Sequence, residues 1–300
     1  MLELLGLMKQ YRTTRAVDEL TCTFEPGKVT GFLGPNGAGK TTTMLLVLGL
    51  QRADAGSVRI GGKRLTDLRD PMRQIGVLLD AQAVHPNRSG RAHLRALAAS
   101  NRLPRWRVDQ SLDRVGLTAV AGRRAGTYSL GMKQRLGIAA ALLGDPAILL
   151  LDEPINGLDP SGIAWARTLL RDLAAEGRTV VLSSHLMSEM EQTADHLIVI
   201  GRGRLIADTS LPAFLSSAKA DTLVVRAPAD FAGALRTAGA EVQLRDDGTF
   251  LVGGLEPRHV AELALARGVL ITELTPQRGS LEDVFMTATA ESLDFEGAVR

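Results

Sequence analysis

One eight-residue segment constrains the fold of this chain more than any other. Gly34-Pro35-Asn36-Gly37-Ala38-Gly39-Lys40-Thr41 fits the pattern G-x-x-x-x-G-K-[ST]. The apolar run 29–33 before it predicts a buried strand, and residues 42–50 after it predict a helix. A glycine-rich turn between a strand and a helix directs backbone N–H groups and positive helix-end potential toward phosphate oxygens. The segment therefore predicts a nucleoside triphosphate site, and the flanking elements disfavour a chance glycine-rich turn.

The residues of this segment have separable expected roles. Lys40 can reach the terminal phosphates and Thr41 can ligate magnesium, so a nucleotide and Mg²⁺ are expected together. The remaining nucleotide contacts in the segment and just after it are expected from these residues: Gly34, Asn36, Gly37, Gly39 and Thr42.

The overall charge limits the classes of partner. The 300 residues carry 35 Lys and Arg against 33 acidic residues, a formal charge of +2. Such a balance gives no reason to expect a nucleic acid or a membrane surface as a direct partner. The single cysteine, Cys22, excludes an internal disulfide and is predicted to lie in a strand. One cysteine is compatible with a reducing compartment.

No segment is predicted to cross a membrane or to direct export. The longest apolar stretch, 136–151, is interrupted by Asp145 and Pro146 and is shorter than the roughly twenty residues that a membrane helix needs. Residues 1–11 lack the basic region, apolar run and cleavage site of a signal peptide. A membrane role would therefore have to come through a partner.

Strand-like and helix-like runs alternate from the start to about residue 208, which predicts a mostly parallel sheet covered by helices. Residues from about 89 to 141 have helical spacing and almost no strand pattern, so they predict a helical insert. After a linker at 209–221, residues 222–290 predict a small domain of order βαββαβ with a hairpin at Asp247-Gly248. Residues 291–300 are predicted to be a tail. The expected fold is a P-loop NTPase α/β core plus a small α+β domain.

A second polar group follows an apolar strand. Residues 147–151 predict a buried strand that ends in Asp152 and Glu153, and parallel sheets bind ligands at such carboxyl ends. Asp152 is expected to hold Mg²⁺, directly or through water. Glu153 is expected to polarise the water that attacks the terminal phosphate. The alternative is a polar strand end in which Glu153 caps a turn.

The order of these motifs resembles the ATP-binding subunit of ABC transporters. The resemblance covers about residues 1–208 and rests on Lys40, Ser129-Leu130-Gly131, Asp152-Glu153, Asp159 and His185. In that family the phosphate loop of one chain and the signature segment of a second chain close over one ATP. The resemblance therefore implies a head-to-tail homodimer that binds Mg·ATP, with a separate transmembrane permease subunit as its partner.

The signature segment departs from the family pattern Leu-Ser-Gly-Gly-Gln at three of its five positions. Tyr128, Leu130 and Met132 replace Leu, Gly and Gln, while Ser129 and Gly131 are retained. The resemblance implies that Ser129 and the Gly131 N–H contact the γ-phosphate bound by the other chain. Because a helix N-terminus supplies N–H groups whatever its side chains are, this contact is expected to persist with altered affinity. The alternative is a helix that Ser129 merely caps.

A second departure follows the predicted strand 75–79. The family carries a glutamine there, whereas this chain has Asp80, with Gln82 two positions later. An acid at this place could bind Mg²⁺ through water, yet it would add negative charge beside the γ-phosphate. Either Asp80 or Gln82 could therefore sense the nucleotide. The resemblance also implies that the membrane partner docks near this segment, at Ala81 to Arg88.

Three further residues match nucleotide contacts of the family. His185 corresponds to the histidine that hydrogen-bonds the γ-phosphate, and Asp159 to the loop that crosses the dimer interface. Tyr11, which lies 29 residues before Lys40, corresponds to the aromatic residue that stacks on adenine. Taken alone, each has an ordinary structural alternative: a strand-end histidine, a turn acid before Pro160 and a packing aromatic residue.

Three functions are compatible with these observations. The first is an ATPase that moves a separate membrane protein; the ending at 280–285 resembles bacterial drug exporters, which favours export and a cytoplasmic location on the inner face of the membrane. The second is a soluble ABC-type ATPase that acts on ribosomes or nucleic acid, which the single phosphate loop and the lack of heptads disfavour. The third is a regulatory ATP-binding module, which the retained Lys40, Asp152, Glu153 and His185 disfavour.

Overall fold

The chain divides into two compact units. The structure is a computed structural model that describes residues 1–216, 222–245, 247–277 and 280–290. Unit 1 comprises Met1–Leu211 and residues 289–290, and unit 2 comprises the described residues within Pro212–Ala288. The predicted tail at 291–300 and the second part of the predicted linker, 217–221, lie outside the described residues.

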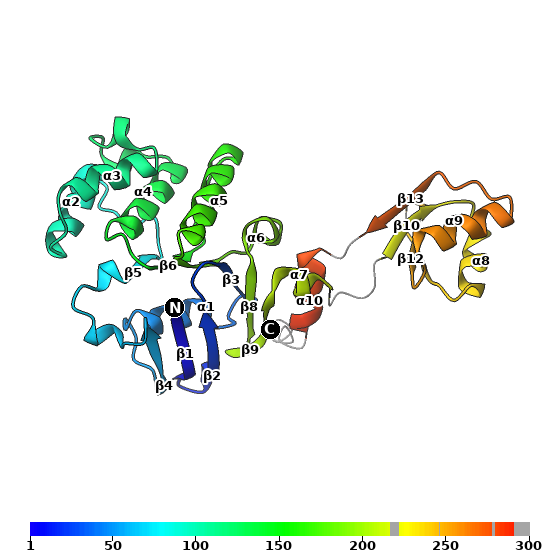
Figure 1. Ribbon diagram of the computed structural model, residues 1–300, viewed down its shortest axis with the longest axis horizontal. Helices are drawn as coiled ribbons and strands as arrows, with labels where there is room; N and C mark the ends of the chain where they lie inside the picture. The colour runs from blue at the N-terminus through cyan, green and yellow to red at the C-terminus, as the bar shows by residue number, and fades with distance from the viewer. Residues whose placement is uncertain (217–221, 246, 278–279, 291–300) are drawn as a thin grey trace, which may run out of the picture. The chain divides into compact units, whose positions relative to one another are not determined.

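The larger sheet of unit 1 is mostly parallel, as predicted (Figure 1). Adjacent strands in this sheet pair in parallel, except for β8 and β9, which pair antiparallel. Every residue of β3 and β7 is buried, which is typical of central strands covered on both faces. In spatial order, the strands are β5 (Ile75–Leu78), β6 (Ile148–Asp152), β7 (Thr179–Ser183), β3 (Val29–Leu33), β8 (His196–Gly201) and β9 (Arg204–Ser210).

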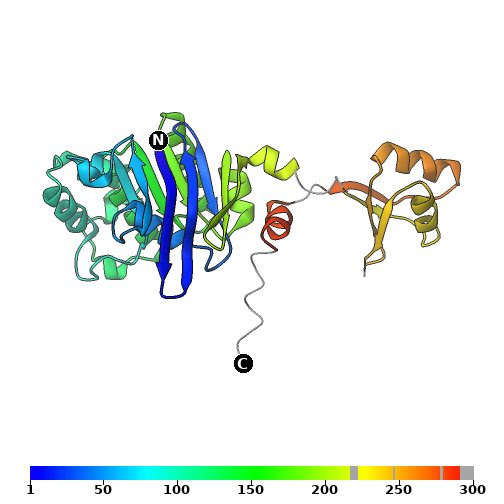
Figure 2. The ribbon, with the colours of Figure 1, turned by 90° about the horizontal axis from the view of Figure 1, so that it is seen from below.

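A second, antiparallel sheet of unit 1 has the order β2 (Thr14–Phe24), β1 (Leu2–Tyr11), β4 (Ala55–Ile60). Figure 2 shows β1 and β2 as long neighbouring strands. One core joins this sheet to helix α1 (Lys40–Val47) and the larger sheet, and in it the rings of Phe24 and Phe32 meet edge to face at 5.8 Å. Burial in this core raises the pKa of Cys22 to about 12, so the thiol stays protonated at neutral pH.

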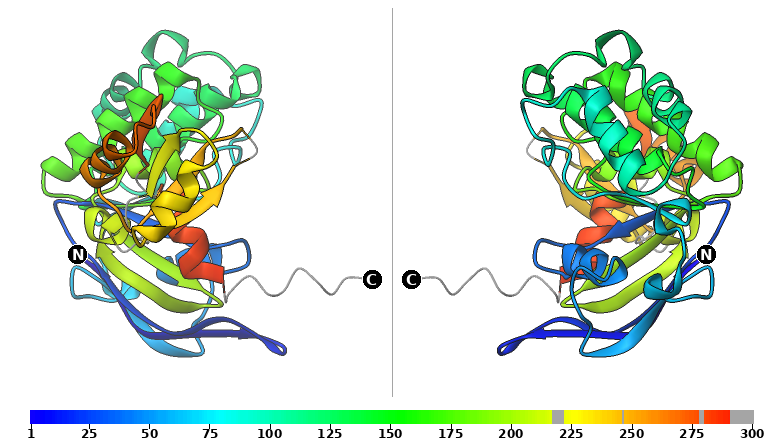
Figure 3. Two further views of the ribbon diagram at one scale, coloured as in Figure 1. Left: turned by 90° about the vertical axis from the view of Figure 1, so that its right-hand side faces the viewer. Right: turned by 90° about the vertical axis from the view of Figure 1, so that its left-hand side faces the viewer.

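The segment predicted as a helical insert holds three helices, α2 (Gly90–Ser100), α3 (Trp106–Arg114) and α4 (Leu130–Leu142). Figures 1 and 3 show them grouped at one side of unit 1, with the β2-β1-β4 sheet at the other. Helices α5 (Pro160–Ala175) and α6 (Met187–Thr193) connect strands of the larger sheet. Among the described residues, no helix has the length and hydropathy needed to span a membrane.

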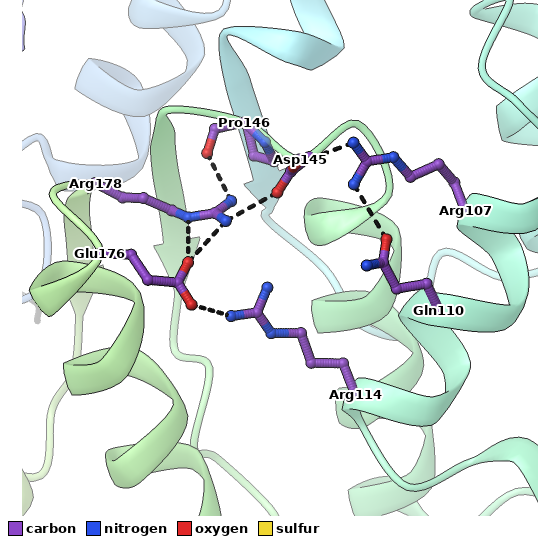
Figure 4. Close-up of polar contacts among 7 residues, drawn as sticks. All are labelled: Arg107, Gln110, Arg114, Asp145, Pro146, Glu176 and Arg178. Atoms are coloured by element: carbon purple, nitrogen blue, oxygen red, sulfur yellow. Dashed lines mark hydrogen bonds and ion pairs between the residues drawn. The ribbon is translucent and has the colours of Figure 1, made fainter.

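A charge network ties α3 to the amino ends of β6 and β7 (Figure 4). Asp145, just before β6, accepts from Arg107 of α3 at 3.0 Å and from Arg178 at 2.8 Å. Glu176 pairs with Arg178 at 2.8 Å and with Arg114 of α3 at 2.7 Å. Each carboxylate therefore contacts two guanidinium groups, which attaches the helical insert to the strands of the core.

Unit 2 has the predicted order βαββαβ. Its sheet, β11-β12-β10-β13, is antiparallel throughout, and β12 lies between β10 and β11 as in a split βαβ unit. The last strand, β13, runs over Glu273–Gln277, and Leu270 before it is exposed. The six elements of this order are β10 (Thr222–Arg226), α8 (Phe231–Thr237), β11 (Glu241–Leu244), β12 (Phe250–Gly253), α9 (Pro257–Ala266) and β13. Helices α7 (Leu211–Ser216) and α10 (Leu281–Thr289) precede and follow them.

Candidate functional site

The glycine-rich segment forms a tight loop between β3 and the start of α1. Gly39 caps α1 at a φ of 102°, in the left-handed region that favours glycine. A Cβ at Gly39 would lie 2.2 Å from the carbonyl oxygen of Ala16 on β2, so no larger residue fits. The loop is thereby held against β2 with its N–H groups at the N-terminus of α1.

Lys40 lies between this loop and two carboxylates. Its Nζ donates to the carbonyl oxygens of Gly34 at 2.5 Å and Pro35 at 3.1 Å. Burial lowers the pKa of Lys40, and the charges of Glu153 and Asp152 oppose that shift. Both carboxylates are therefore close enough to act on the lysine electrostatically, which means that the end of β6 and the phosphate loop face one space.

Ser183 joins the two acids that end β6. It is the last residue of the neighbouring strand β7 and is fully buried. Its hydroxyl donates to Asp152 Oδ1 and accepts the N–H of Glu153 at 3.1 Å. No role was predicted for Ser183 from the sequence; the available signal was a small polar residue at the end of a buried strand.

The carboxylate of Glu153 and the ring of His185 contact each other, with Nδ1 at 2.8 Å from Oε2. Glu153 has a φ of 49°, a conformation that costs a residue with a side chain roughly 1–3 kcal/mol. Its carbonyl oxygen accepts from the side-chain amide of Gln134 at 2.8 Å. Hydrogen bonds thus hold both sides of a strained residue. No role was predicted for Gln134 from the sequence either.

A magnesium ion would find few protein ligands here. Among the residues that the structure describes, no three His, Cys, Asp or Glu side chains gather closely enough to hold a metal. Thr41 is exposed at the start of α1, and Asp152 ends β6. One hydroxyl and one carboxylate suit Mg²⁺, which takes most of its other ligands from water and phosphate oxygens. The donor set therefore fits an ion that arrives with the nucleotide.

The side chain of Asp80 stabilises the turn that begins at this residue. Its Oδ1 accepts the N–H of Gln82 at 2.7 Å. The side chain of Gln82 is exposed and has no hydrogen-bond partner within the described part of the chain. A carboxylate can accept further hydrogen bonds, so both Asp80 and Gln82 stay predictions for the residue that senses the nucleotide.

Ser129 and Asp159 both cap helices. Ser129 Oγ accepts the N–H of Met132 at 3.2 Å at the start of α4. Asp159 accepts the N–H of Gly162 at 2.9 Å and the hydroxyl of Ser161 at 3.0 Å, and these bonds lower the pKa of its carboxyl. For Ser129 this is the structural alternative raised from the sequence, whereas Asp159, for which the alternative was a turn acid before Pro160, caps α5. A hydroxyl or a carboxylate can accept more than one bond, so capping and nucleotide contact are compatible.

Tyr11 ends β1 with 41% of its surface exposed. Its hydroxyl contacts the side-chain oxygen of Gln51, and Lys9 Nζ lies 5.4 Å from the ring centroid. Gln51 follows the end of α1, whereas Lys40 begins that helix. Gln51 and Lys9 thus hold the Tyr11 ring, which remains open to solvent. Its hydroxyl is attached just after the C-terminal end of α1, whereas Lys40 lies at the N-terminal end of that helix.

Two family profiles match the chain. The profile described as ABC transporter matches residues 17–156, a range that includes the phosphate loop, the signature segment and the acids at the end of β6. A profile described as a domain of unknown function, DUF8746, matches residues 221–282, in unit 2.

Individual proteins resemble the chain over most of its length. The uncharacterized ABC transporter ATP-binding protein YhcH of Bacillus subtilis is 36% identical over 303 residues, which cover 97% of this chain and 96% of the relative. The bacitracin transport ATP-binding protein BcrA of Bacillus licheniformis is 40% identical over 205 residues, 67% of each chain. A solved ATP binding subunit of an ABC transporter superposes with a TM-score of 0.66 at 26% identity, covering 72% of this chain and 92% of that one.

Proposed function

This chain is an ATPase of the ABC transporter family, and on that premise we propose that two copies close head to tail on Mg·ATP to drive export of a small molecule through a separate membrane subunit. The observation that carries the proposal is the convergence of Lys40, Asp152 and Glu153 at the carboxyl ends of β3 and β6, which lie on either side of β7. Similarity to a bacitracin transport protein supports an antibiotic-like substrate.

Each residue of the half-site has one task. The loop N–H groups and Lys40 bind the phosphates, and Thr41 and Asp152 hold Mg²⁺, which when bound neutralises charge on the phosphate oxygens. Glu153 orients the attacking water and accepts its proton. His185, 2.8 Å from Glu153, holds that carboxylate in place and binds the γ-phosphate.

The second half of each site comes from the other copy. Ser129 and the Gly131 N–H of that copy bind the γ-phosphate from the start of α4, and Asp159 lines the interface from the start of α5. Tyr11 stacks on the adenine of its own site. Closure then completes the site and excludes water, and release of phosphate reopens it.

The membrane subunit docks on a surface that runs along α2. This surface begins at Ala81–Arg88, before the helix, and continues to the residues that follow the helix. A hollow of about 250 Å³ lies between residues 69–73 and 100–103, and one of about 520 Å³ adjoins it at Leu103. Five arginines line these hollows, and within the described residues none has an ion-pair partner. A segment that carries carboxylates fits such a surface. The five are Arg69, Arg73, Arg95, Arg102 and Arg105.

Two measurements test the dimer. The Glu153→Gln variant, which is expected to bind ATP but hydrolyse it far more slowly, should run as a dimer in size-exclusion chromatography with light scattering when saturated with Mg·ATP. Cysteines placed at Ser129 and Asn36 are expected to cross-link between copies only with ATP. A monomer under these conditions, without any cross-link, would contradict the proposal.

Co-purification tests the membrane partner. Tagged chain is expected to retain a membrane protein, and the double variant Arg73→Glu, Arg102→Glu to lose it while the isolated chain hydrolyses ATP as before. Retention of ribosomes or nucleic acid instead would favour the soluble ATPase.

A further inference from the structure

Helix α4 contacts three parts of the candidate site. Its first turn packs on the loop after β6, where a Cβ at Gly157 would lie 2.2 Å from Leu130 Cδ2. Its middle packs on the end of β5, where a Cβ at Gly137 would lie 2.6 Å from Leu78 Cδ1. With contacts this close, α4 cannot shift without moving the loop after β6 or the end of β5.

Gln134 carries the third contact. Its side chain is 5% exposed, and its Nε2 donates to the carbonyl oxygen of Glu153 at 2.8 Å. The same oxygen accepts the N–H of Asn156 at 3.2 Å, which begins the turn after β6. A buried amide is costly unless it is hydrogen-bonded, so separating Gln134 from this carbonyl inside the protein would be unfavourable.

The carbonyl that Gln134 holds belongs to a strained residue. Glu153 has a φ of 49°, and its N–H is fixed by Ser183 on the other side. Rotation of either flanking peptide would turn the Cα–Cβ direction and carry the carboxylate away from His185, which it now meets at 2.8 Å. The Gln134 bond therefore acts on the direction of the carboxylate through the backbone.

We propose that Gln134 is a positioning residue that orients the Glu153 carboxylate, so that this orientation depends on the position of α4. The inference rests on the proposed head-to-tail dimer, in which Ser129, five residues before Gln134 on the same rigid helix, contacts ATP bound by the other copy. Gln134 then couples the nucleotide at one composite site to the carboxylate that serves the other.

Mixed dimers of the full-length chain test this coupling. One copy carries Glu153→Gln, so that only the site served by the other copy's Glu153 turns over. Gln134→Met, which keeps the side-chain length but lacks the N–H donor, is placed either in the copy that retains Glu153 or in the silent copy. Hydrolysis by each is compared with the mixed dimer that lacks Gln134→Met.

The two placements separate positioning from a structural role. With Gln134→Met beside the active Glu153, kcat is expected to fall roughly three- to tenfold at unchanged KM. With the substitution in the silent copy, whose α4 supplies Ser129 to the active site, kcat is expected to stay at the reference value. Equal kcat in all three dimers, or a loss confined to the silent placement, would overturn the inference.

Folding and the dimer itself are checked separately. If Gln134→Met lowers the melting temperature by more than a few degrees, Gln134→Asn replaces it, since the shorter amide also cannot reach the carbonyl. Failure of the reference mixed dimer to form or to hydrolyse ATP would refute the proposed dimer and, with it, this inference. Normal turnover by the reference together with normal turnover by the variants refutes the inference alone.

Discussion

Carboxylates at the two ends of the larger sheet of unit 1 differ in whether they form ion pairs with arginine. At the amino ends of β6 and β7, Asp145 and Glu176 each contact two arginines (Figure 4). At the carboxyl ends, Asp152 meets a serine hydroxyl and Glu153 meets a histidine, and within the described residues neither pairs with a lysine or an arginine. Lys40, which faces them, donates instead to loop carbonyls.

This difference distinguishes carboxylates that stabilise the fold from carboxylates that are available to bind a ligand. Asp145 and Glu176 have their partners inside the chain, so the folded protein already receives their electrostatic stabilisation. Asp152 and Glu153 keep negative charge beside a phosphate loop, and Glu153 also retains a strained backbone. A site of this kind gains most from a cation and a polar ligand that bind together.

The largest expected effect is at the carboxyl end. Glu153→Gln should lower ATP hydrolysis about 10²- to 10⁴-fold, because the amide cannot accept the proton of the attacking water. The melting temperature should stay within a few degrees of wild type. Phosphate release and thermal unfolding measure the two.

Glu176→Gln is the matched control at the amino end. It removes one carboxylate at the end of α5, beside the amino end of β7, and should leave hydrolysis within about threefold of wild type, since Glu176 lies at the other end of the strands from Glu153. A large loss of turnover in this variant, with the fold intact, would show that carboxylates at the two ends of the sheet do not differ in their importance for hydrolysis.

The next effect concerns stability. Asp145→Asn should lower the free energy of unfolding by about 1 kcal/mol, a modest value because 38% of the Asp145 side chain is exposed. Asp145 has a φ of 56°, and asparagine tolerates this region too, so the variant removes the charge without a new backbone cost. Urea unfolding measures the loss, and an unchanged midpoint would show that the network is not stabilising.

The same stabilisation should disappear in acid. Burial raises the pKa of Asp145, but the hydrogen bonds and charges of Arg178 and Arg107 outweigh it and hold the pKa below its usual range. A carboxyl with a lowered pKa in the folded state stabilises above its unfolded pKa and loses that contribution as pH falls through the folded value. The stability difference between wild type and Asp145→Asn should therefore be constant near pH 7 and shrink below about pH 4. A difference that grows in acid would contradict this sign.

The smallest effect is expected at the adenine. Tyr11→Ala should weaken ATP binding by about tenfold at most, because an aromatic stack is worth about 0.5–1.5 kcal/mol. Tyr11→Phe keeps the ring and loses only the contact with Gln51, so it should bind ATP almost as wild type does. A fluorescent ATP analogue measures both, and equal weakening by the two variants would assign the effect to the hydroxyl.

The pattern of residues along the chain was enough to predict the mostly parallel sheet, the helical insert and the split βαβ unit. Buried strands such as 29–33 and 148–152 appear as apolar runs, and the turns between elements appear as glycine, proline and asparagine, because both signals are local. The same local logic put Lys40 after one strand and Asp152-Glu153 after another, and the sheet brings those ends together.

Tertiary structure alone decided which side chains support that site. Gln134 and Glu153 are 19 residues apart, and Ser183 and Glu153 are 30 apart, so no local pattern marks either pair. The bond that Asp80 accepts from the N–H of Gln82 is likewise not revealed by the residue types. The sequence by itself determined the elements and the charges at their ends, because backbone propensity and burial act over short distances. The packing of α4 and the order of the strands decided which of those charges are paired, because hydrogen bonds depend on neighbours in space.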